Sequence, residues 1–388
     1  MFCHKPPWPM VDGGTVATAR MVEGLVDRGV EVEVIALATS KHPGGAGIPG
    51  AIRCDEVEVD TRLRISGALA NLFRPTPYQL DRFFDRSVLE FLRDRLRRSE
   101  PDVLQLDGVG VLPYLQYLRG VFEGIVIYRA QNAEFRIARD RARALRAPVS
   151  WWLNRQADRL ERMEAAAYRE VDGVVAISEP VAAQCREWTE KPVTVIGVGV
   201  PVVGTPQVAT AGDLVHLGAM DWAPNREGVG WFLREVWPEV RRRHPQLDLH
   251  LAGRRSEFLE REASGTGVVI DGEVDNVADY LVNHGLMVVP LLSGSGLRVK
   301  IIEGMALGKA MIASPVAAEG LGVEDGRHLL VADDAPQWIA AIDRCLGDAS
   351  LVAGLGIEAH AFARSSYLIS DLSGALEKFY RLLAKSTA

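Results

Sequence analysis

The sequence predicts an α/β protein built from two Rossmann-like domains. Short β-branched runs alternate with longer stretches of helical periodicity along the chain, which is typical of βα units on a parallel sheet. The 388 residues are enough for two compact domains. Between the two series lies a stretch rich in Gly and Pro, which neither helix nor strand accommodates readily. We therefore expect a first domain at 1–197, a linker at 198–212, a second domain at 213–364 and a C-terminal segment at 365–388.

Only three residues precede the proline-rich loop that begins at His4, so we expect either a short first strand or a true start that lies upstream. Further strands are expected at residues 30–37, 103–106, 124–128, 173–177 and 193–196. Helices are expected between them at residues 14–27, 81–99, 149–168 and 179–188.

The second domain repeats the alternation after the linker. Strands are expected at residues 214–217, 248–252, 268–271, 286–290, 310–314 and 328–331. Helices are expected at residues 226–243, 277–283, 297–306 and 336–346. The stretch 369–384 has the pattern of an amphipathic helix, which we expect to pack back across the first domain.

The composition argues against several classes of protein. A formal charge of −7 disfavours a nucleic-acid partner, because phosphate neutralisation dominates that affinity. The four cysteines show no CxxC or Cys/His spacing, so neither a disulfide scaffold nor a metal site is expected. There is no long apolar run and no charged-then-apolar leader. We expect a cytoplasmic protein that could still touch the inner face of the cell membrane.

The most informative segment is 293–308, where a glycine-rich turn connects a strand ending at Pro290 to an apolar helix. Backbone N–H groups at such a turn favour an anion, which predicts a phosphate site. Arg298 and Lys300 put two cations at the positive end of the helix, where an anion would balance them. Glu303 lies among apolar neighbours and needs donors, which a ribose diol would supply. The alternatives are an ordinary βα loop, solvated cations and a Lys300–Glu303 salt bridge.

This segment resembles the donor-binding signature of retaining GT-B glycosyltransferases of family 4, in which two glutamates are separated by seven residues. Glu303 matches the second glutamate, and Ser295 stands at the position of the first. Gly296, Arg298 and Lys300 are similar to a Gly-x-Arg-x-Lys pattern in one branch of the family. The resemblance implies the GT-B fold, with two Rossmann-like domains facing across a cleft, a nucleoside diphosphate sugar as donor, and no cofactor or metal.

The resemblance extends upstream to residues 217–229, which are similar to a Gly-Ser-Met-x-Trp-x-Pro-Asn motif of that branch. Ala219 and Glu227 stand where many members place an arginine and a lysine on the donor diphosphate, so Arg298 and Lys300 are expected to supply the two cations. Residues 253 and 271–275 match base- and ribose-pocket positions, with simple strand-to-helix turns as the alternative. The predicted donor site comprises Gly13, Gly14, Gly218, Asn225, Gly253, Val274, Ser295, Gly296, Leu297 and Glu303.

The acceptor side is expected in the first domain. Gly13 and Gly14 resemble the family's first βα loop, where the backbone approaches the transferred sugar and the diphosphate. Trp8 in the preceding loop is either an acceptor contact or part of an ordered connection. Residues 129–134 resemble a His-Asn-x-Glu motif of the family, with Gln131 at the histidine position, where it is expected to hydrogen-bond a sugar hydroxyl.

A basic, aromatic stretch follows that loop. Residues 129–162 contain nine arginines and four acidic residues, and Trp151 and Trp152 lie among them. Such a stretch suits an anionic bilayer or a lipid-linked acceptor. The favoured alternative is a helix whose tryptophans pack inward while its arginines are solvated.

The resemblance implies a hexosyltransferase acting with retention and without metal, in glycan, glycolipid or glycosylated-metabolite biosynthesis. The acceptor would be a glycan, a lipid-linked sugar or a small molecule. The alternatives are another GT-B enzyme, such as a nucleotide-sugar epimerase, and a non-catalytic sugar-nucleotide-binding partner subunit. The candidate catalytic residues are Arg298, Lys300 and Gln131, and the candidate acceptor contacts are Trp8, Asn132 and Glu134.

Overall fold

A computed structural model of the chain describes residues 1–143, 145–202, 204–206, 212–264, 267–294 and 296–387. The chain divides into two compact units. The first contains Met1–Gly199 and Ile369–Ala388, and the second contains Val200–Leu368. These bounds lie a few residues from the predicted ones at 197 and 365, and much of the predicted linker, at 203 and 207–211, falls outside the described residues.

The first unit is built on a parallel sheet in the order β3-β2-β1-β4-β5-β6-β7. Its central strands are buried along their length, as expected for parallel strands covered on both faces. The strand order reverses between β1 and β4, where ligands of open α/β sheets bind outside the carboxyl ends. The strands are β1 (Phe2–Cys3), β2 (Glu33–Ala38), β3 (Arg53–Glu58), β4 (Val103–Asp107), β5 (Ile125–Ala130), β6 (Gly173–Ala176) and β7 (Val193–Val195).

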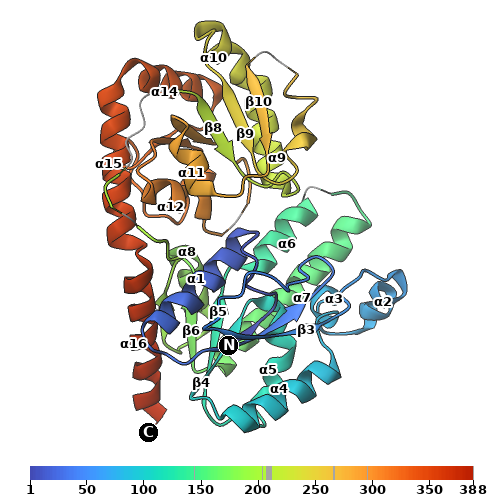
Figure 1. The fold of residues 1–388 in the computed structure, drawn as a ribbon. Coiled ribbons are helices and arrows are strands. Elements are labelled where there is room, and N and C mark those ends of the chain that lie inside the picture. The colour runs from blue at the N-terminus through green and yellow to red at the C-terminus, as the bar shows by residue number, and fades with distance from the viewer. Residues whose placement is uncertain (144, 203, 207–211, 265–266, 295, 388) are drawn as a thin grey trace. The chain divides into compact units, whose positions relative to one another are not determined.

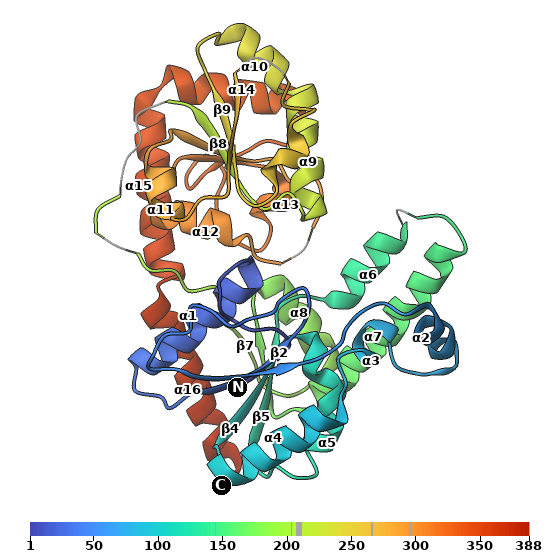
Figure 2. The same ribbon diagram turned by 45° about the vertical axis from the view of Figure 1, so that its right-hand side comes forward.

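Several elements of the first unit differ from prediction. The predicted helix at 81–99 begins later, as α4 at Arg86, and only its first residue belongs to the short helix α3. α2, α5, α6 and β3 were not predicted. α6 and α7 lie side by side, as Figures 1 and 2 show. The helices are α1 (Gly13–Asp27), α2 (Ile65–Ala70), η1 (Asn71–Phe73), α3 (Tyr78–Asp81), α4 (Arg86–Ser99), η2 (Val109–Tyr114), α5 (Leu115–Leu118), α6 (Glu134–Arg143), α7 (Val149–Glu170) and α8 (Glu179–Trp188).

The C-terminal helix α16 (Ile369–Thr387) packs on this first unit, as predicted. Its apolar stripe buries Leu376, Phe379 and Leu383 against Met21 and Leu25 of α1 and against the sheet. Tyr380 donates a hydrogen bond of 2.6 Å to the side-chain oxygen of Gln105 in β4. The last helix of the chain therefore completes the core of the first unit.

The second unit repeats the same topology with six parallel strands in the order β10-β9-β8-β11-β12-β13. The order reverses between β8 and β11. Both sheets therefore have the doubly wound order that the alternation of elements predicts. The strands are β8 (Leu214–Leu217), β9 (Leu249–Ala252), β10 (Val268–Gly272), β11 (Leu286–Val289), β12 (Met311–Ala313) and β13 (Leu330–Val331).

Helices of the second unit pack around this sheet (Figure 1). The 18-residue helix α15 was not predicted. Phe232 and Trp338 meet edge to face at 5.4 Å in the core beneath α9 and α14. The helices are α9 (Ala223–Glu235), α10 (Trp237–Arg243), η3 (Ser256–Leu259), α11 (Val277–Val282), α12 (Val299–Ala306), α13 (Pro315–Ala318), α14 (Ala335–Gly347) and α15 (Ala349–Ser366). Among the described residues, none of the helices has the length and apolar character needed to cross a bilayer.

Candidate active site

The switch point of the second unit carries the predicted donor residues. Gly218 follows β8, and the turn at 290–298 follows β11, so both stand at the carboxyl ends of neighbouring strands. Helix α12 begins at Val299 and not at the predicted 297, because Arg298 has a non-helical backbone with ψ of 81°. The first turn of α12 therefore opens beside the end of β8.

Lys300 is the central cation of this edge. Its Nζ donates a hydrogen bond of 2.8 Å to Oδ1 of Asn225. Nδ2 of Asn225 in turn donates a hydrogen bond of 2.9 Å to the carbonyl oxygen of Ala219. Burial, and then the nearby Arg298, lower the pKa of Lys300 to about 7. His216, buried behind it in β8, has a pKa far below its usual value because of burial and of Lys300. An incoming anion would therefore meet a lysine that is ready to take up a proton.

Gly218 leaves room for that lysine. A Cβ added there would lie 2.5 Å from Nζ of Lys300 and 2.6 Å from Nδ2 of Asn225, which is closer than such atoms can approach. Gly253, at the end of β9, packs as tightly, since its added Cβ would lie 2.4 Å from the carbonyl oxygen of Gly218. The two glycines therefore leave the space that the Lys300–Asn225 pair occupies at the strand ends.

Arg298 precedes α12 and is 5% exposed. Its guanidinium carbon lies 5.9 Å from the centre of the Trp222 ring, and Nη1 donates to the carbonyl of Gly296. Burial lowers the pKa of Arg298 from its ordinary value, although an arginine still stays charged near neutral pH. The structure thus brings the two predicted cations to the start of one helix.

The other predicted donor residues of the second unit lie nearby in sequence or on neighbouring strand ends. Glu303 is partly buried on α12, Leu297 is partly buried before it, and Val274 is partly buried between β10 and α11. Ser295 lies outside the described residues.

The switch point of the first unit forms a separate cavity of roughly 190 Å³. It is lined from the ends of β1, β4 and β5 and from the start of α1. Four predicted residues, Gly14, Gln131, Asn132 and Glu134, line it, and Gly13 is exposed at the start of α1. The remaining lining residues are His4, Lys5, Gly108, Val109 and Tyr128.

Asp107, the last residue of β4, holds the side chain of Gln131, which lines this cavity. It accepts hydrogen bonds from Gln131 Nε2 at 2.8 Å and from Thr18 Oγ1 at 2.8 Å, and it pairs with Arg129 at 3.3 Å. Asp107 and Arg129 are both buried. Because the amide nitrogen of Gln131 is held by Asp107, its Oε1 lies toward Gly14, 3.1 Å from where a Cβ would stand there.

Lys5 supplies the cation of this cavity. Its Nζ lies 2.7 Å from Asp12, the N-cap of α1, whose carboxylate also accepts from the backbone N–H of Thr15. Burial raises the pKa of Asp12, but Lys5 and these hydrogen bonds outweigh it and bring the pKa to about 2. Burial raises the pKa of Glu134, which also lines the cavity and accepts a hydrogen bond of 3.1 Å from Asn132.

Two family models match the chain. The model described as Glycosyltransferase Family 4 matches residues 11–203, and the model described as Glycosyl transferases group 1 matches residues 211–348. Together they span most of both units. The chain is a family 4-type glycosyltransferase.

The glycosyltransferase has the GT-B fold, as its structural neighbours show. Sucrose-phosphate synthase from Thermosynechococcus elongatus is similar with a TM-score of 0.73 and 17% identity, covering 99% of this chain and 98% of that one. Anabaena HepE in complex with UDP-glucose is similar with a TM-score of 0.63 and 13% identity, covering 97% and 98%. The Escherichia coli trehalose-6-phosphate protein bound with UDP-2-fluoro glucose has a TM-score of 0.67 and 12% identity, covering 98% of each.

One curated relative is an uncharacterized 44.6 kDa protein in the cps region of Klebsiella pneumoniae. It is 21% identical over 164 residues, which is 40% of the glycosyltransferase chain. The match spans 42% of the length of that relative.

The structure corrects one predicted contact of this glycosyltransferase. Trp8 is 2% exposed and packs with Cys3, Ala19 and Val22, and its Nε1 donates 3.2 Å to Glu23. Its ring fills the space between α1 and the first strands, so in this structure it offers no surface to an acceptor. The alternative interpretation of Trp8, part of an ordered connection, is the one that this packing supports.

Sequence analysis also missed several polar residues of the first unit. Lys5 and Asp107 were not singled out, although both stand at the carboxyl ends of strands beside the switch point, where ligands of open α/β sheets bind. The burial of Arg129, which places its guanidinium on Asp107, depends on the sheet and carries no local signal.

Proposed function

We propose that this glycosyltransferase moves a sugar from a nucleoside diphosphate sugar to an acceptor hydroxyl, with retention of anomeric configuration. The observation that supports a nucleotide donor is the Lys300–Asn225 pair beside Arg298 at the start of α12. Two cations and a helix N-terminus match the charge of a diphosphate. HepE in complex with UDP-glucose and the E. coli protein bound with UDP-2-fluoro glucose share this fold, which favours a uridine nucleotide among the candidates.

In this proposal the chain itself stabilises the departing diphosphate. Arg298, held over the ring of Trp222, donates hydrogen bonds to one phosphate of the donor. Lys300 gives up its hydrogen bond to Asn225 and donates to the other phosphate instead. Glu303 accepts hydrogen bonds from the ribose hydroxyls. Because both cations stand where charge develops, the transfer needs no divalent metal at the diphosphate.

Gln131 of the first unit is proposed to bind the sugar. With its nitrogen held by Asp107, its oxygen can accept a hydrogen bond from a sugar hydroxyl at Gly14. The relative from a cps region supports a place in polysaccharide biosynthesis, with a glycan or a lipid-linked sugar as acceptor.

The test is a donor screen with UDP-, GDP- and ADP-sugars, following binding and slow donor hydrolysis. We expect one base to bind, activity to persist in EDTA, and the anomeric proton of the product to show the configuration of the donor by NMR. Arg298→Ala and Glu303→Ala should lose turnover, whereas Arg226→Ala, an exposed arginine on α9, should not. Binding by none of the donors, in folded protein, would sink the proposal. An epimerised donor would favour the epimerase, and a partner effect that survives both variants would favour the non-catalytic subunit.

We also infer that the first unit docks on an anionic membrane surface. Four apolar side chains around α2 are exposed, Leu63, Ile65, Leu69 and Phe73, the last by 93%. Exposed arginines flank them at 62, 64 and 74, where the first two pair with Asp60 and the third pairs with Asp81. The adjoining α7, which contacts this segment through Arg159 and the carbonyl of Asn71, adds Trp151, which is 58% exposed. Apolar side chains ringed by arginines suit an anionic bilayer.

Vesicle sedimentation tests this docking. The protein should bind vesicles containing anionic phospholipid and not purely zwitterionic ones. Phe73→Asp should reduce the binding, and Ile357→Asp, at an exposed isoleucine of the second unit, should leave it unchanged. Equal binding by both variants would contradict the inference.

A further inference from the structure

Two histidines and an aspartate of the second unit gather at the edge of the sheet opposite to the donor residues. Asp213 immediately precedes β8, His250 lies near the start of β9, and His284 lies between α11 and β11. β9, β8 and β11 are neighbours in the sheet, so the three residues meet at the amino ends of these strands. Lys300 and Gly218 lie at the carboxyl ends. None of the three residues is among the predicted donor residues.

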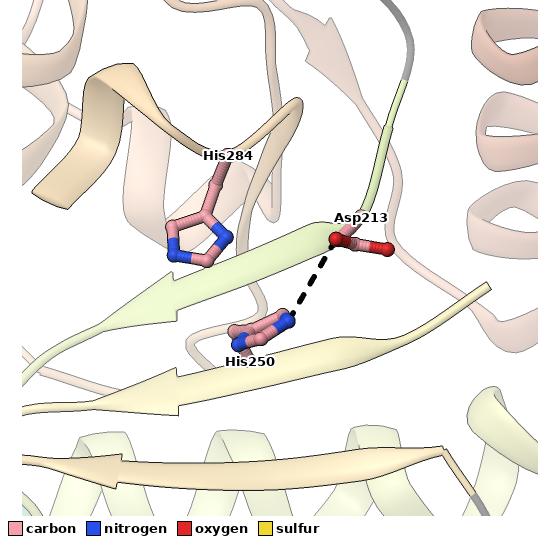
Figure 3. Close-up of side chains that lie close together, drawn as sticks. All are labelled: Asp213, His250 and His284. Atoms are coloured by element: carbon pink, nitrogen blue, oxygen red, sulfur yellow. Dashed lines mark ion pairs between the residues drawn. The ribbon is translucent and has the colours of Figure 1, made fainter.

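The three side chains converge, as Figure 3 shows. One ligand atom from each, a carboxylate oxygen and two imidazole nitrogens, lies within 4.8 Å of the others. Nε2 of His250 is 3.8 Å from the carboxylate of Asp213, and the two imidazole centres are 4.4 Å apart. Around a tetrahedral Zn²⁺, with bonds of about 2.0–2.1 Å, ligand atoms stand about 3.3 Å apart, so the side chains must draw inward by about an ångström.

The surroundings of His250 are those of a metal ligand. Its Nδ1 lies 2.9 Å from Oδ2 of Asp271, and the hydroxyl of Tyr280 donates to the same oxygen. A zinc-bound imidazole usually donates its other ring N–H to a carboxylate. That carboxylate fixes the orientation of the ring and makes the metal-binding nitrogen more basic. Here the remaining ring nitrogen, Nε2, is the one directed at Asp213.

His284 provides an independent observation. Its Nδ1 is buried and has no hydrogen-bond partner among the residues that the structure describes. A buried nitrogen without a hydrogen-bond partner lowers the stability of the folded protein, so its presence in a native structure needs a physical reason. A bound cation would supply the missing partner. A cluster held together only by ion pairing leaves this nitrogen unexplained.

We propose that Asp213, His250 and His284 bind one divalent transition-metal ion, with Zn²⁺ as the preferred ion and water in the fourth position. Imidazole and carboxylate together suit Zn²⁺ better than Mg²⁺ or Ca²⁺, which take oxygen ligands. The charges of Asp213 and Asp271 balance the ion. The ion ties the entry of the second unit to β9 and to the end of α11. This site is separate from the proposed metal-independent transfer chemistry.

The test uses untagged full-length protein, stripped with a chelator and titrated calorimetrically with Zn²⁺. We expect one ion per chain, and a rise in Tm on its addition. Co²⁺ in its place should give the visible absorption of a tetrahedral centre. His284→Ala should abolish saturable binding, and Asp271→Asn should weaken it by about 10- to 100-fold. The control is His244→Ala, which removes a histidine paired with a single aspartate, Asp343, at 2.7 Å.

Each result bears on the proposal. One ion per chain, lost in His284→Ala and kept in His244→Ala, supports it. No saturable binding by the wild-type chain, or equal binding by His284→Ala, overturns it. Should His284→Ala fail to fold, Asp271→Asn decides the matter, because unchanged affinity in that variant would also overturn the assignment.

Discussion

Replacing Lys300 with methionine should abolish a proton uptake that accompanies donor binding. Burial and Arg298 bring the pKa of Lys300 to about 7 in the free protein, so near pH 8 only about a tenth of the molecules carry the ammonium. A bound diphosphate favours the charged form, which returns the pKa toward its ordinary value. Binding near pH 8 should therefore take up about 0.9 proton, and binding near pH 6 about 0.1.

The protonation of Lys300 also sets the pH dependence of donor affinity. Because the protonated lysine is the form that binds, donor affinity should fall about tenfold between about pH 6 and about pH 8, or about 1.4 kcal/mol. Titration calorimetry in two buffers of different ionisation enthalpy measures the uptake. A nucleotide sugar is the proper ligand, since its diphosphate does not titrate in this range.

Two variants make this test decisive. Lys300→Met should bind weakly at every pH and take up no proton, while Lys378→Met, at an exposed lysine of α16, should behave like the wild type. Uptake near zero in the wild type near pH 8, or the same uptake in Lys300→Met, would refute the reasoning.

Three further predictions concern packing. Gly218→Ala should fold normally by circular dichroism yet lose most donor affinity by calorimetry, because the new Cβ displaces Lys300 and Asn225; unchanged affinity would contradict the tight packing. Asp107→Ala should destabilise the chain by about 3–5 kcal/mol in denaturant unfolding, since it leaves Arg129 buried without its partner, whereas exposed Asp140→Ala should change little. Phe379→Ala should cost about 3–5 kcal/mol by the same measurement, and exposed Leu382→Ala on the same helix should not.

The sequence predicted most of the fold because the elements of parallel sheets have strong local signals. Buried strands such as β6 and β11 are continuous apolar runs, and the helices between them are amphipathic. α15 was missed because its small and apolar residues, with several glycines and alanines, show little amphipathic contrast. α6 was missed because its many arginines indicate a solvated loop as readily as a helix.

The residues of the candidate site also differ in how far the sequence could predict them. Arg298 and Lys300 could be found because they belong to one contiguous glycine-rich segment. Trp8 was assigned to the acceptor side because the sequence does not show whether a tryptophan in a loop is buried. Its burial depends on the packing of α1 against it. Asp213, His250 and His284 are far apart in sequence, with no metal-binding spacing, and only the order of the strands brings them together.

The docking of α16 on the first unit has a consequence for how the chain folds during synthesis. The core around Met21 and Leu25 needs Phe379 and Leu383, which leave the ribosome after the whole second unit. The second unit can close on its own residues as it emerges, whereas the first must wait with apolar surface exposed. The first unit to be made is thus the last to be finished. A chain cut before Ile369 should therefore yield a folded second unit attached to an aggregation-prone first one.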